Sequence, residues 1–340
     1  MKKSTIKDIA KYCEVGPSTV SRVLNNVTEG FSVKQEVREK ILNAAKKLNY
    51  MPNPAAKNLK GQKSNLILLL GLQNWIFRAG SLYRQLILSA AEQLQQNSYQ
   101  VHIALPPANC DESMLAHTAF DGALVIHGDT FPSLEDYLQK RRIPYVKVNK
   151  YSNYPNSSSV EYDDVAGVEK AMNNLLQLGH KKIAFGMKYK RDINVPEHIS
   201  FKKRYETYAR ILEDNKLPFM QNDYFESSED FLKEMFIKQK NTAVLAHEIR
   251  TAVEIYESAK KMKIRIPGDL SLICFNEVSD MNYPELDCMT VPGEKMGIAA
   301  ADVLLSKIKD YNYTENVLVE GELLVGKTCS KPKKGIRNER

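Results

Sequence analysis

The stretch VGPSTVSRVLNN, residues 15–26, predicts a short helix that begins at Pro17. Proline suits the first helical position, where its missing N–H has no intrahelical acceptor, and Gly16 is an acceptable N-cap. At helical spacing the side chains sort onto two sides, with Val20, Val23 and Leu24 inward and Ser18, Ser21, Arg22 and Asn25 outward. The polar side chains on the outward side do not contribute to a core, so packing does not explain them.

Two further helices are predicted on either side of this one. Residues 5–8, TIKD, form a pattern typical of a capping box, and the helix that follows has an apolar stripe. Residues 32–35, SVKQ, have the same pattern and predict the start of a third helix. A tight turn around Gly16 between the first two helices gives helix-turn-helix geometry, which places the second helix in the DNA major groove. The alternative is three helices of a larger α domain.

Charge favours the DNA-binding interpretation. Residues 1–61 hold 12 Lys and Arg against 5 Asp and Glu, whereas the whole chain holds 48 against 41. The net formal charge of +7 therefore lies within the first fifth of the chain. A concentrated positive segment on a neutral body is typical of phosphate binding.

The segments STIKDIAKYCEVGPSTVSRVLNN and VREKILNAAKKLNYMPNPAAKNLKG resemble the headpiece of the lactose-repressor (LacI/GalR) family of bacterial transcription regulators. The resemblance extends from Thr5 to about Val325 and is most specific in residues 5–61. It implies base contacts from Pro17, Ser18 and Arg22, and phosphate contacts from Thr5, Thr19, Ser21 and Asn25. Gly16 replaces the usual serine. Because Pro17 and Ser18 offer little to a base edge, direct readout is expected to rest on Arg22, which suits guanine.

Residues 53–61, NPAAKNLKG, have an N-cap at Asn53 and a stop at Gly61, but a helix this short is unstable alone. A plain linker is the alternative. The resemblance implies a hinge helix that folds on operator DNA, with Leu59 as a wedge in the minor groove. It also implies Ala56 at the approach of two hinge helices, and DNA contacts from Asn53 and Lys57.

Beyond residue 61 the sequence predicts an α/β fold. Apolar strand candidates at 65–71, 99–105, 121–126, 143–148, 181–186, 242–246 and 270–275 alternate with helical stretches at 81–97, 164–178, 200–215, 249–263 and 295–309. The resemblance implies a two-lobed effector and dimerisation domain over 62–330, like a periplasmic sugar-binding protein. Lobe 1 is expected at about 62–158 and 290–316, and lobe 2 at about 159–289 and 317–330. Residues 331–340 are expected to form a disordered basic tail.

Ligands of such lobes bind at the C-terminal ends of the strands. Residues that follow those strand candidates, or that match family positions, give the expected effector contacts Trp75, Phe77, His127, Arg204, His247 and Asn276. Trp75 and Phe77 have a core position as their alternative. His247-Glu248 and Asn276 depart from the family's Asn-Asp and Asp, which leaves the effector open. A sugar, a sugar phosphate, a nucleoside, a co-repressing protein or no effector at all are the alternatives.

No catalytic or metal-binding constellation is expected. His102, Cys110 and His117 lack a metal-site spacing, and the five cysteines show no pairing framework, as suits a reducing cytoplasm. No phosphate loop, export signal or membrane span is recognised. We therefore expect a cytoplasmic, non-enzymatic repressor of carbohydrate genes, without cofactor, that binds a palindromic operator as a homodimer and responds to a small effector. A sugar-binding module and an enzyme of sugar metabolism are the alternatives.

Overall fold

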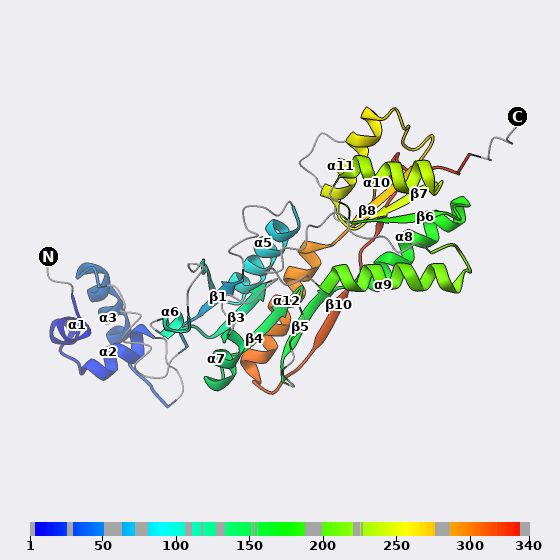
Figure 1. The fold of residues 1–340 in the computed structure, drawn as a ribbon. Helices are drawn as coiled ribbons and strands as arrows, with labels where there is room; N and C mark the ends of the chain where they lie inside the picture. Colours follow the sequence, from blue (N-terminus) through cyan, green and yellow to red (C-terminus); the bar gives the residue numbers. More distant parts are fainter. Residues whose placement is uncertain are drawn as a thin grey trace, which may run out of the picture. The chain divides into compact units, whose positions relative to one another are not determined.

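The computed structural model describes residues 4–25, 30–50, 63–71, 81–105, 111–116, 118–126, 133–150, 152, 154, 156–187, 199–219, 225, 227–275 and 286–333. By its internal contacts the chain divides into an N-terminal unit, Met1–Ser64, and a C-terminal unit, Asn65–Arg340. The order of the elements along the chain can be followed in Figure 1.

The N-terminal unit contains the three helices α1 (Ile6–Cys13), α2 (Pro17–Leu24) and α3 (Gln35–Lys47). Their inward side chains make a small core around Ile9, Val20, Val23 and Ile41, all fully buried. The predicted capping box at the start of α1 is confirmed, because the Thr5 hydroxyl accepts from the Asp8 amide and the Asp8 carboxylate accepts from the Thr5 amide.

The second predicted capping box is wrong. Helix α3 begins at Gln35 with Lys34 as its N-cap, and no side chain caps it. The pattern SVKQ requires the helix to begin directly after Ser32, but residues 32–34 remain outside the helix. Because the helix begins two residues later than the pattern requires, Ser32 and Gln35 do not form a capping box.

The first lobe of the C-terminal unit is built on a six-stranded parallel sheet. Its spatial order is β10 (Asn316–Val319), β5 (Ser158–Tyr162), β4 (Tyr145–Val148), β3 (Gly122–Ile126), β1 (Leu66–Leu70), β2 (Gln100–Ile103). The sheet continues a few residues past the expected lobe boundaries at 158 and 316. Helices α5 (Ser81–Gln96) and α12 (Gly293–Lys309) pack on one face, and α6 (Ser113–Ala116) and α7 (Leu134–Lys140) pack on the other.

Two glycines let α12 lie very close to α5. A Cβ at Gly293 would come within 2.4 Å of the Leu82 carbonyl oxygen, and one at Gly297 within 2.3 Å of the Leu86 carbonyl oxygen. Side chains at these positions would push the helices apart, so the pair is fixed as one layer (Figure 1).

The second lobe is built on a five-stranded sheet in the spatial order β11 (Leu323–Leu324), β9 (Asp287–Met289), β8 (Ser271–Phe275), β7 (Ala243–Ala246), β6 (Ile183–Gly186). All neighbours are parallel except β11 with β9. Helices α8 (Asp164–Leu178) and α9 (Ile199–Asp214) cover one face. The other face carries α10 (Ser228–Leu232), the π-helix η1 (Lys233–Lys238) and α11 (Ile249–Lys261).

The chain passes between the two lobes three times in the described residues: after β5, after β9 and after β10. The buried core is continuous across these passages, because one cluster contains Val146 and Val160 from the first sheet and Phe185 and Phe275 from the second. The C-terminal ends of strands from both sheets, where ligands bind in such folds, are thereby held together.

Candidate functional site

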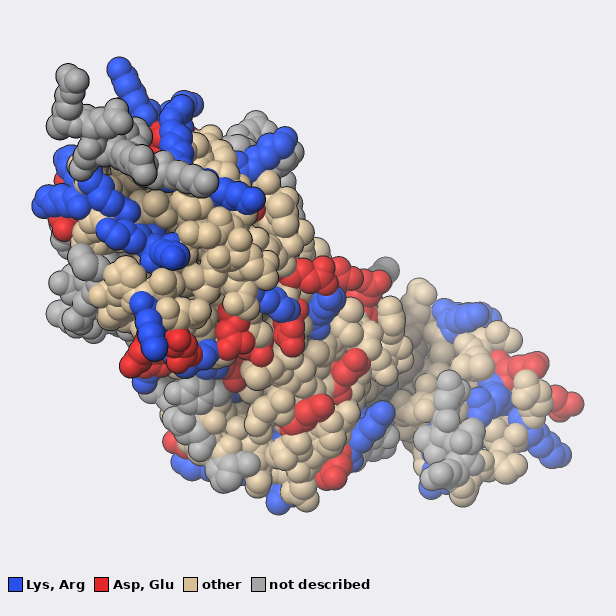
Figure 2. Space-filling model, turned by 90° about the vertical axis from the view of Figure 1, so that its right-hand side faces the viewer, with Lys and Arg blue, Asp and Glu red and all other residues tan. Residues whose placement is uncertain are grey.

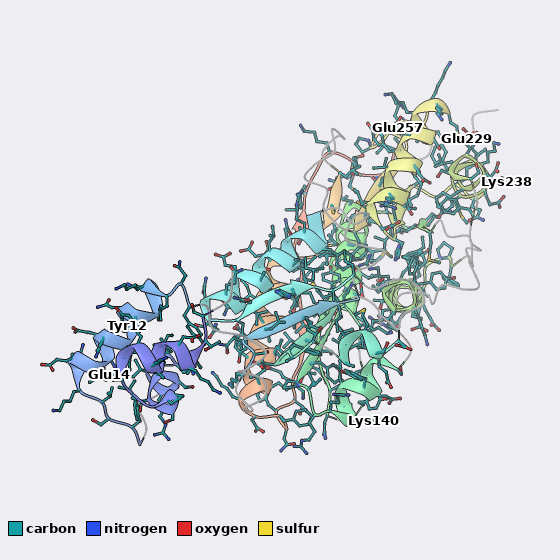
Figure 3. The ribbon with its side chains drawn as sticks, turned by 90° about the vertical axis from the view of Figure 1, so that its left-hand side faces the viewer. Tyr12, Glu14, Lys140, Glu229, Lys238 and Glu257 are labelled. Carbon is teal, nitrogen blue, oxygen red and sulfur yellow. The ribbon has the colours of Figure 1, made fainter. Side chains whose placement is uncertain are left out.

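The turn between α1 and α2 determines how the second helix is presented. Glu14, at the end of α1, has left-handed backbone angles with φ 60°, and Gly16 is the N-cap of α2 with Pro17 at its first position. Glu14 is labelled in Figure 3. The chain reverses within these few residues, and Pro17 and Ser18 at the start of α2 are exposed.

The predicted sorting of α2 is confirmed. Val20 and Val23 are fully buried, whereas Pro17, Ser18 and Arg22 are exposed. Thr19, Ser21 and Asn25 are half-buried on the flanks. The outer face of α2 is therefore a polar strip with one guanidinium.

Two of the expected phosphate contacts already use their polar groups within the unit. The Thr5 hydroxyl donates to the Asp8 carboxylate at 2.7 Å, so its single proton is committed. The side-chain amide of Asn25 donates to the Ser21 backbone carbonyl at 2.8 Å. A phosphate contact from the Thr5 hydroxyl as a donor requires the bond to Asp8 to break.

The N-terminal unit carries several exposed basic side chains. Those that are exposed in the described part of this unit are Lys7, Lys11, Arg22, Lys34, Lys40, Lys46, Lys47 and Lys63. The Arg22 guanidinium lies 5.3 Å from the centre of the Phe31 ring, close enough for a cation–π contact. This contact restrains the one side chain of α2 that is best suited to read a base.

In the C-terminal unit a buried arginine lies beyond the C-terminal ends of the second sheet. Arg204, on α9, pairs with Asp164, the first residue of α8, through Nε at 2.6 Å from Oδ1. The Arg204 Nη1 donates to the backbone carbonyl of His247, also at 2.6 Å. Only about 5% of the Arg204 side chain and 4% of the Asp164 side chain are exposed.

Two aromatic rings lie beside the guanidinium of this ion pair. The Arg204 guanidinium lies 3.9 Å from the centre of the Phe275 ring and 5.7 Å from that of Tyr162. The His247 ring stacks on Phe201 with 3.8 Å between centroids. The charges are therefore held in apolar surroundings, where electrostatic interactions are strong.

The first lobe contributes Tyr83 and Asn149 close to the same place. The Asn149 amide donates to the Tyr83 hydroxyl at 3.2 Å, and burial raises the pKa of Tyr83 while the Arg204 charge opposes that rise. Burial likewise raises the pKa of Tyr162. Burial also raises the pKa of the half-buried Glu248, against the charges of Arg250 and Arg204.

Of the six expected effector contacts, two lie within the described residues. Arg204 and His247 are brought together, although His247 meets Arg204 through its backbone carbonyl. Trp75, Phe77, His127 and Asn276 lie outside the described residues, as do the hinge residues Asn53, Ala56, Lys57 and Leu59. Asp164, Phe275 and Tyr83 were not expected; the only sequence signal for Asp164 is the Asp-Asp pair that follows a strand.

No group of three His, Cys, Asp or Glu side chains suited to a metal ion occurs among the described residues. Cys110 and His117 lie outside them, and His102 is an exposed residue of β2. The four described cysteines are free thiols. No helix in the described parts of the chain has the length and apolar character needed to span a bilayer.

Residues 5–53 match the lacI family of bacterial regulatory proteins, and residues 172–329 match the periplasmic binding protein-like domain. The chain therefore combines a LacI-family DNA-binding domain with a periplasmic binding protein-like domain. It is 26% identical to the ribose operon repressor of Haemophilus influenzae, over 93% of this chain and 95% of the relative. It is also 26% identical to the probable repressor ExuR of Bacillus subtilis, over 94% of this chain and 97% of the relative.

Solved structures show the same fold. The lac repressor dimer bound to operator and the anti-inducer ONPF has a TM-score of 0.75 at 20% identity, over 97% of this chain and all of that one. A LacI-family regulator from Enterococcus faecium with bound ribose has a TM-score of 0.64 at 18% identity, over 79% of this chain and 99% of that one.

Proposed function

We propose that this LacI-family protein is a cytoplasmic transcriptional repressor that binds a palindromic operator through α2 and responds to a small ligand held by its C-terminal unit. The observation that carries the proposal is the exposed polar face of α2, presented by the Glu14–Gly16 turn among basic side chains. Neither a sugar-binding module nor an enzyme needs such a face.

Relatives over nearly the whole chain are named as repressors, one of them of a ribose operon. Carbohydrate uptake or catabolism is therefore the proposed field of regulation. The proposal also includes a hinge helix over residues 53–61 and a wedge role for Leu59 in the minor groove. These residues lie outside the described part of the chain.

An exposed edge of the first lobe supports a homodimer. Helix α6 has only four residues, and the edge strand β2 leaves Ile103 exposed, with Leu105 exposed just beyond it. Leu88 on the neighbouring α5 is 63% exposed. Exposed apolar side chains at a sheet edge are typical of an interface, and a two-fold dimer matches the symmetry of a palindrome with two half-sites.

The test is selection of bound fragments from genomic DNA, followed by affinity measurements at several salt concentrations on selected and random duplexes. We expect tight binding to a palindromic fragment and weak, steeply salt-dependent binding to random DNA. Equal affinities for the two at every salt concentration would contradict sequence-specific repression.

A further inference from the structure

The ion pair between Arg204 and Asp164 has a consequence for the charge of the ligand. The Arg204 guanidinium is engaged by three described groups at once: the Asp164 carboxylate, the His247 carbonyl and the Phe275 ring. Its positive charge is thus already balanced inside the protein, before any ligand arrives.

An anionic ligand at this place meets an unfavourable balance of charge. A carboxylate or phosphate that approaches Arg204 also approaches Asp164, whose oxygen is 2.6 Å from the Arg204 Nε. Because both side chains are buried, with the Tyr162 and Phe275 rings beside Arg204, water screens the like-charge repulsion poorly. Glu248, also near Arg204, adds a second carboxyl group to the surroundings.

A ligand hydroxyl meets the opposite situation. It donates its proton to a carboxylate and accepts a hydrogen bond from a guanidinium, so one group satisfies both members of the pair. Neither member has to give up its counter-charge. On the first lobe, the Tyr83 hydroxyl, whose pKa the Arg204 charge lowers against burial, and the Asn149 amide that donates to it are neutral hydrogen-bonding groups.

We propose that Asp164 is the charge filter of the ligand site: by neutralising Arg204 it selects an uncharged, polyhydroxylated ligand and excludes carboxylates and phosphates. This inference rests on the proposed function, because it assigns the ligand class of the same site. It separates sugars from sugar phosphates and uronates, which the sequence alone leaves open.

The experiment compares the full chain with Asp164→Asn by isothermal titration at constant ionic strength. The probes are inorganic phosphate, glucuronate and ribose 5-phosphate, with glucose and ribose as their neutral counterparts. Asparagine keeps the shape of the side chain and an oxygen that accepts from Arg204, but it removes the negative charge. We expect no saturable binding of the anions by the wild type, and a gain of roughly tenfold or more in affinity for them in Asp164→Asn.

The matched control is Glu169→Gln. Glu169 is another carboxylate of α8 with an arginine partner, Arg210 at 2.7 Å, but about half of its side chain is exposed. This variant also removes one negative charge from α8, and it is expected to bind the anions no better than the wild type. A gain equal to that of Asp164→Asn would show an effect of net charge and would overturn the filter.

A folding defect is checked by the thermal midpoint of each variant. If Asp164→Asn does not fold, Asp164→Ser repeats the test with a smaller polar side chain. Saturable binding of any of the anions by the wild type overturns the proposal without a variant, and so does a folded charge-removing variant that gains no anion binding. Failure of the chain to prefer a palindromic DNA fragment would instead refute the proposed function, and that result is independent of the anion titrations.

Discussion

Arg22 is the residue on which base recognition by α2 is expected to depend. It is the exposed guanidinium of that helix, and the Phe31 ring restrains it. Arg22→Ala should weaken binding to the selected palindrome by about 1–3 kcal/mol and relax the preference at one base position, with little effect on random DNA. Fluorescence anisotropy on single-base variants of the palindrome measures both effects.

Lys46→Ala is the control for Arg22, since it removes the same charge from an exposed position on α3. It should leave the base preference unchanged. If Arg22→Ala weakens binding to palindromic and random DNA equally, Arg22 is a phosphate contact.

His180 makes the second lobe sensitive to acid. Its ring nitrogens contact the Thr242 hydroxyl at 2.8 Å and the Ser330 carbonyl oxygen at 2.9 Å, and burial lowers its pKa below the ordinary 6.5. The unfolded chain therefore binds the proton more readily than the folded one. The stabilisation is complete above pH 6.5 and is lost as the pH falls below it.

Urea unfolding between pH 7.5 and 5.5 tests this prediction. His180→Gln should show a shallower decline of the unfolding free energy with falling pH than the wild type. His102→Gln, which changes an exposed histidine of β2, should keep the wild-type slope. Identical slopes in all three proteins would show that His180 does not carry the effect.

At the scale of elements, Asp287 holds the end of the second lobe in place. Its Oδ2 accepts from the amide of Thr328 at 2.8 Å, the Thr328 hydroxyl at 3.1 Å and the amide of Cys329 at 2.9 Å. Asp287→Ala leaves the amides of Thr328 and Cys329 without their acceptor, whereas the Thr328 hydroxyl keeps the Leu272 carbonyl at 2.6 Å, so the variant should lower the free energy of unfolding by about 1–3 kcal/mol.

Denaturant unfolding monitored by circular dichroism gives this value. The control Asp230→Ala removes an exposed carboxylate that pairs with Lys233 on the surface, and it should change the stability by less than about 0.5 kcal/mol. A similar loss in both variants would argue against the anchoring role of Asp287.

The strands that could be predicted from the sequence are those with continuous apolar runs. Each of the seven predicted strands is present, within a residue or two of its expected ends. Strand β5, SSVEY, was not expected, because its buried polar residues resemble a loop. Ser159 bonds to Asn316, and Glu161 pairs with Lys203, so distant residues satisfy them. Such partners are invisible in a local pattern.

The residues of the candidate ligand site could likewise be predicted only in part from the sequence. Arg204 could be singled out only by its match to a position of the resembled family, because it lies within a predicted helix and follows no strand directly. Asp164 and Tyr83 come from a helix start and from the other lobe, and only the folded chain brings them close to Arg204. By contrast, the division of the α2 side chains into inward and outward faces depends on residues within one turn of each other. It could therefore be predicted from the sequence alone.

Charge on the whole molecule is less even than its composition implies. Figure 2 shows Lys and Arg side chains gathered over the second lobe and acidic ones across the middle of the molecule. Exposed residues that follow the C-terminal ends of α8, η1 and α11 include Lys181, Lys182, Lys240 and Lys263. Cations are favoured at helix C-termini, so a structural cause explains these residues without a binding partner.

At the scale of the assembly, Leu88 and Leu318 lie on opposite sides of the first lobe and are similarly exposed, at 63% and 58%. Leu88 is on α5 beside the β2 edge, and Leu318 is on the β10 edge. If the β2 edge forms the homodimer, Leu88→Glu should yield monomers and weaken palindrome binding, whereas Leu318→Glu should do neither. Light scattering after size exclusion, combined with DNA titration, distinguishes the two variants. If Leu88→Glu still forms dimers, the β2 edge is not the dimer interface.

The chain passes back and forth between the two lobes of the C-terminal unit, and this determines the order in which the parts of the protein can fold during synthesis. The core of the N-terminal unit is complete within residues 6–50, whereas the first sheet lacks β10, and the second lacks β11, until residues beyond 316 have been synthesised. Domains fold as units during synthesis, beginning with the N-terminal one. The nascent chain thus acquires the unit proposed to bind DNA long before it has a ligand site, and newly made protein passes through a stage that no metabolite controls.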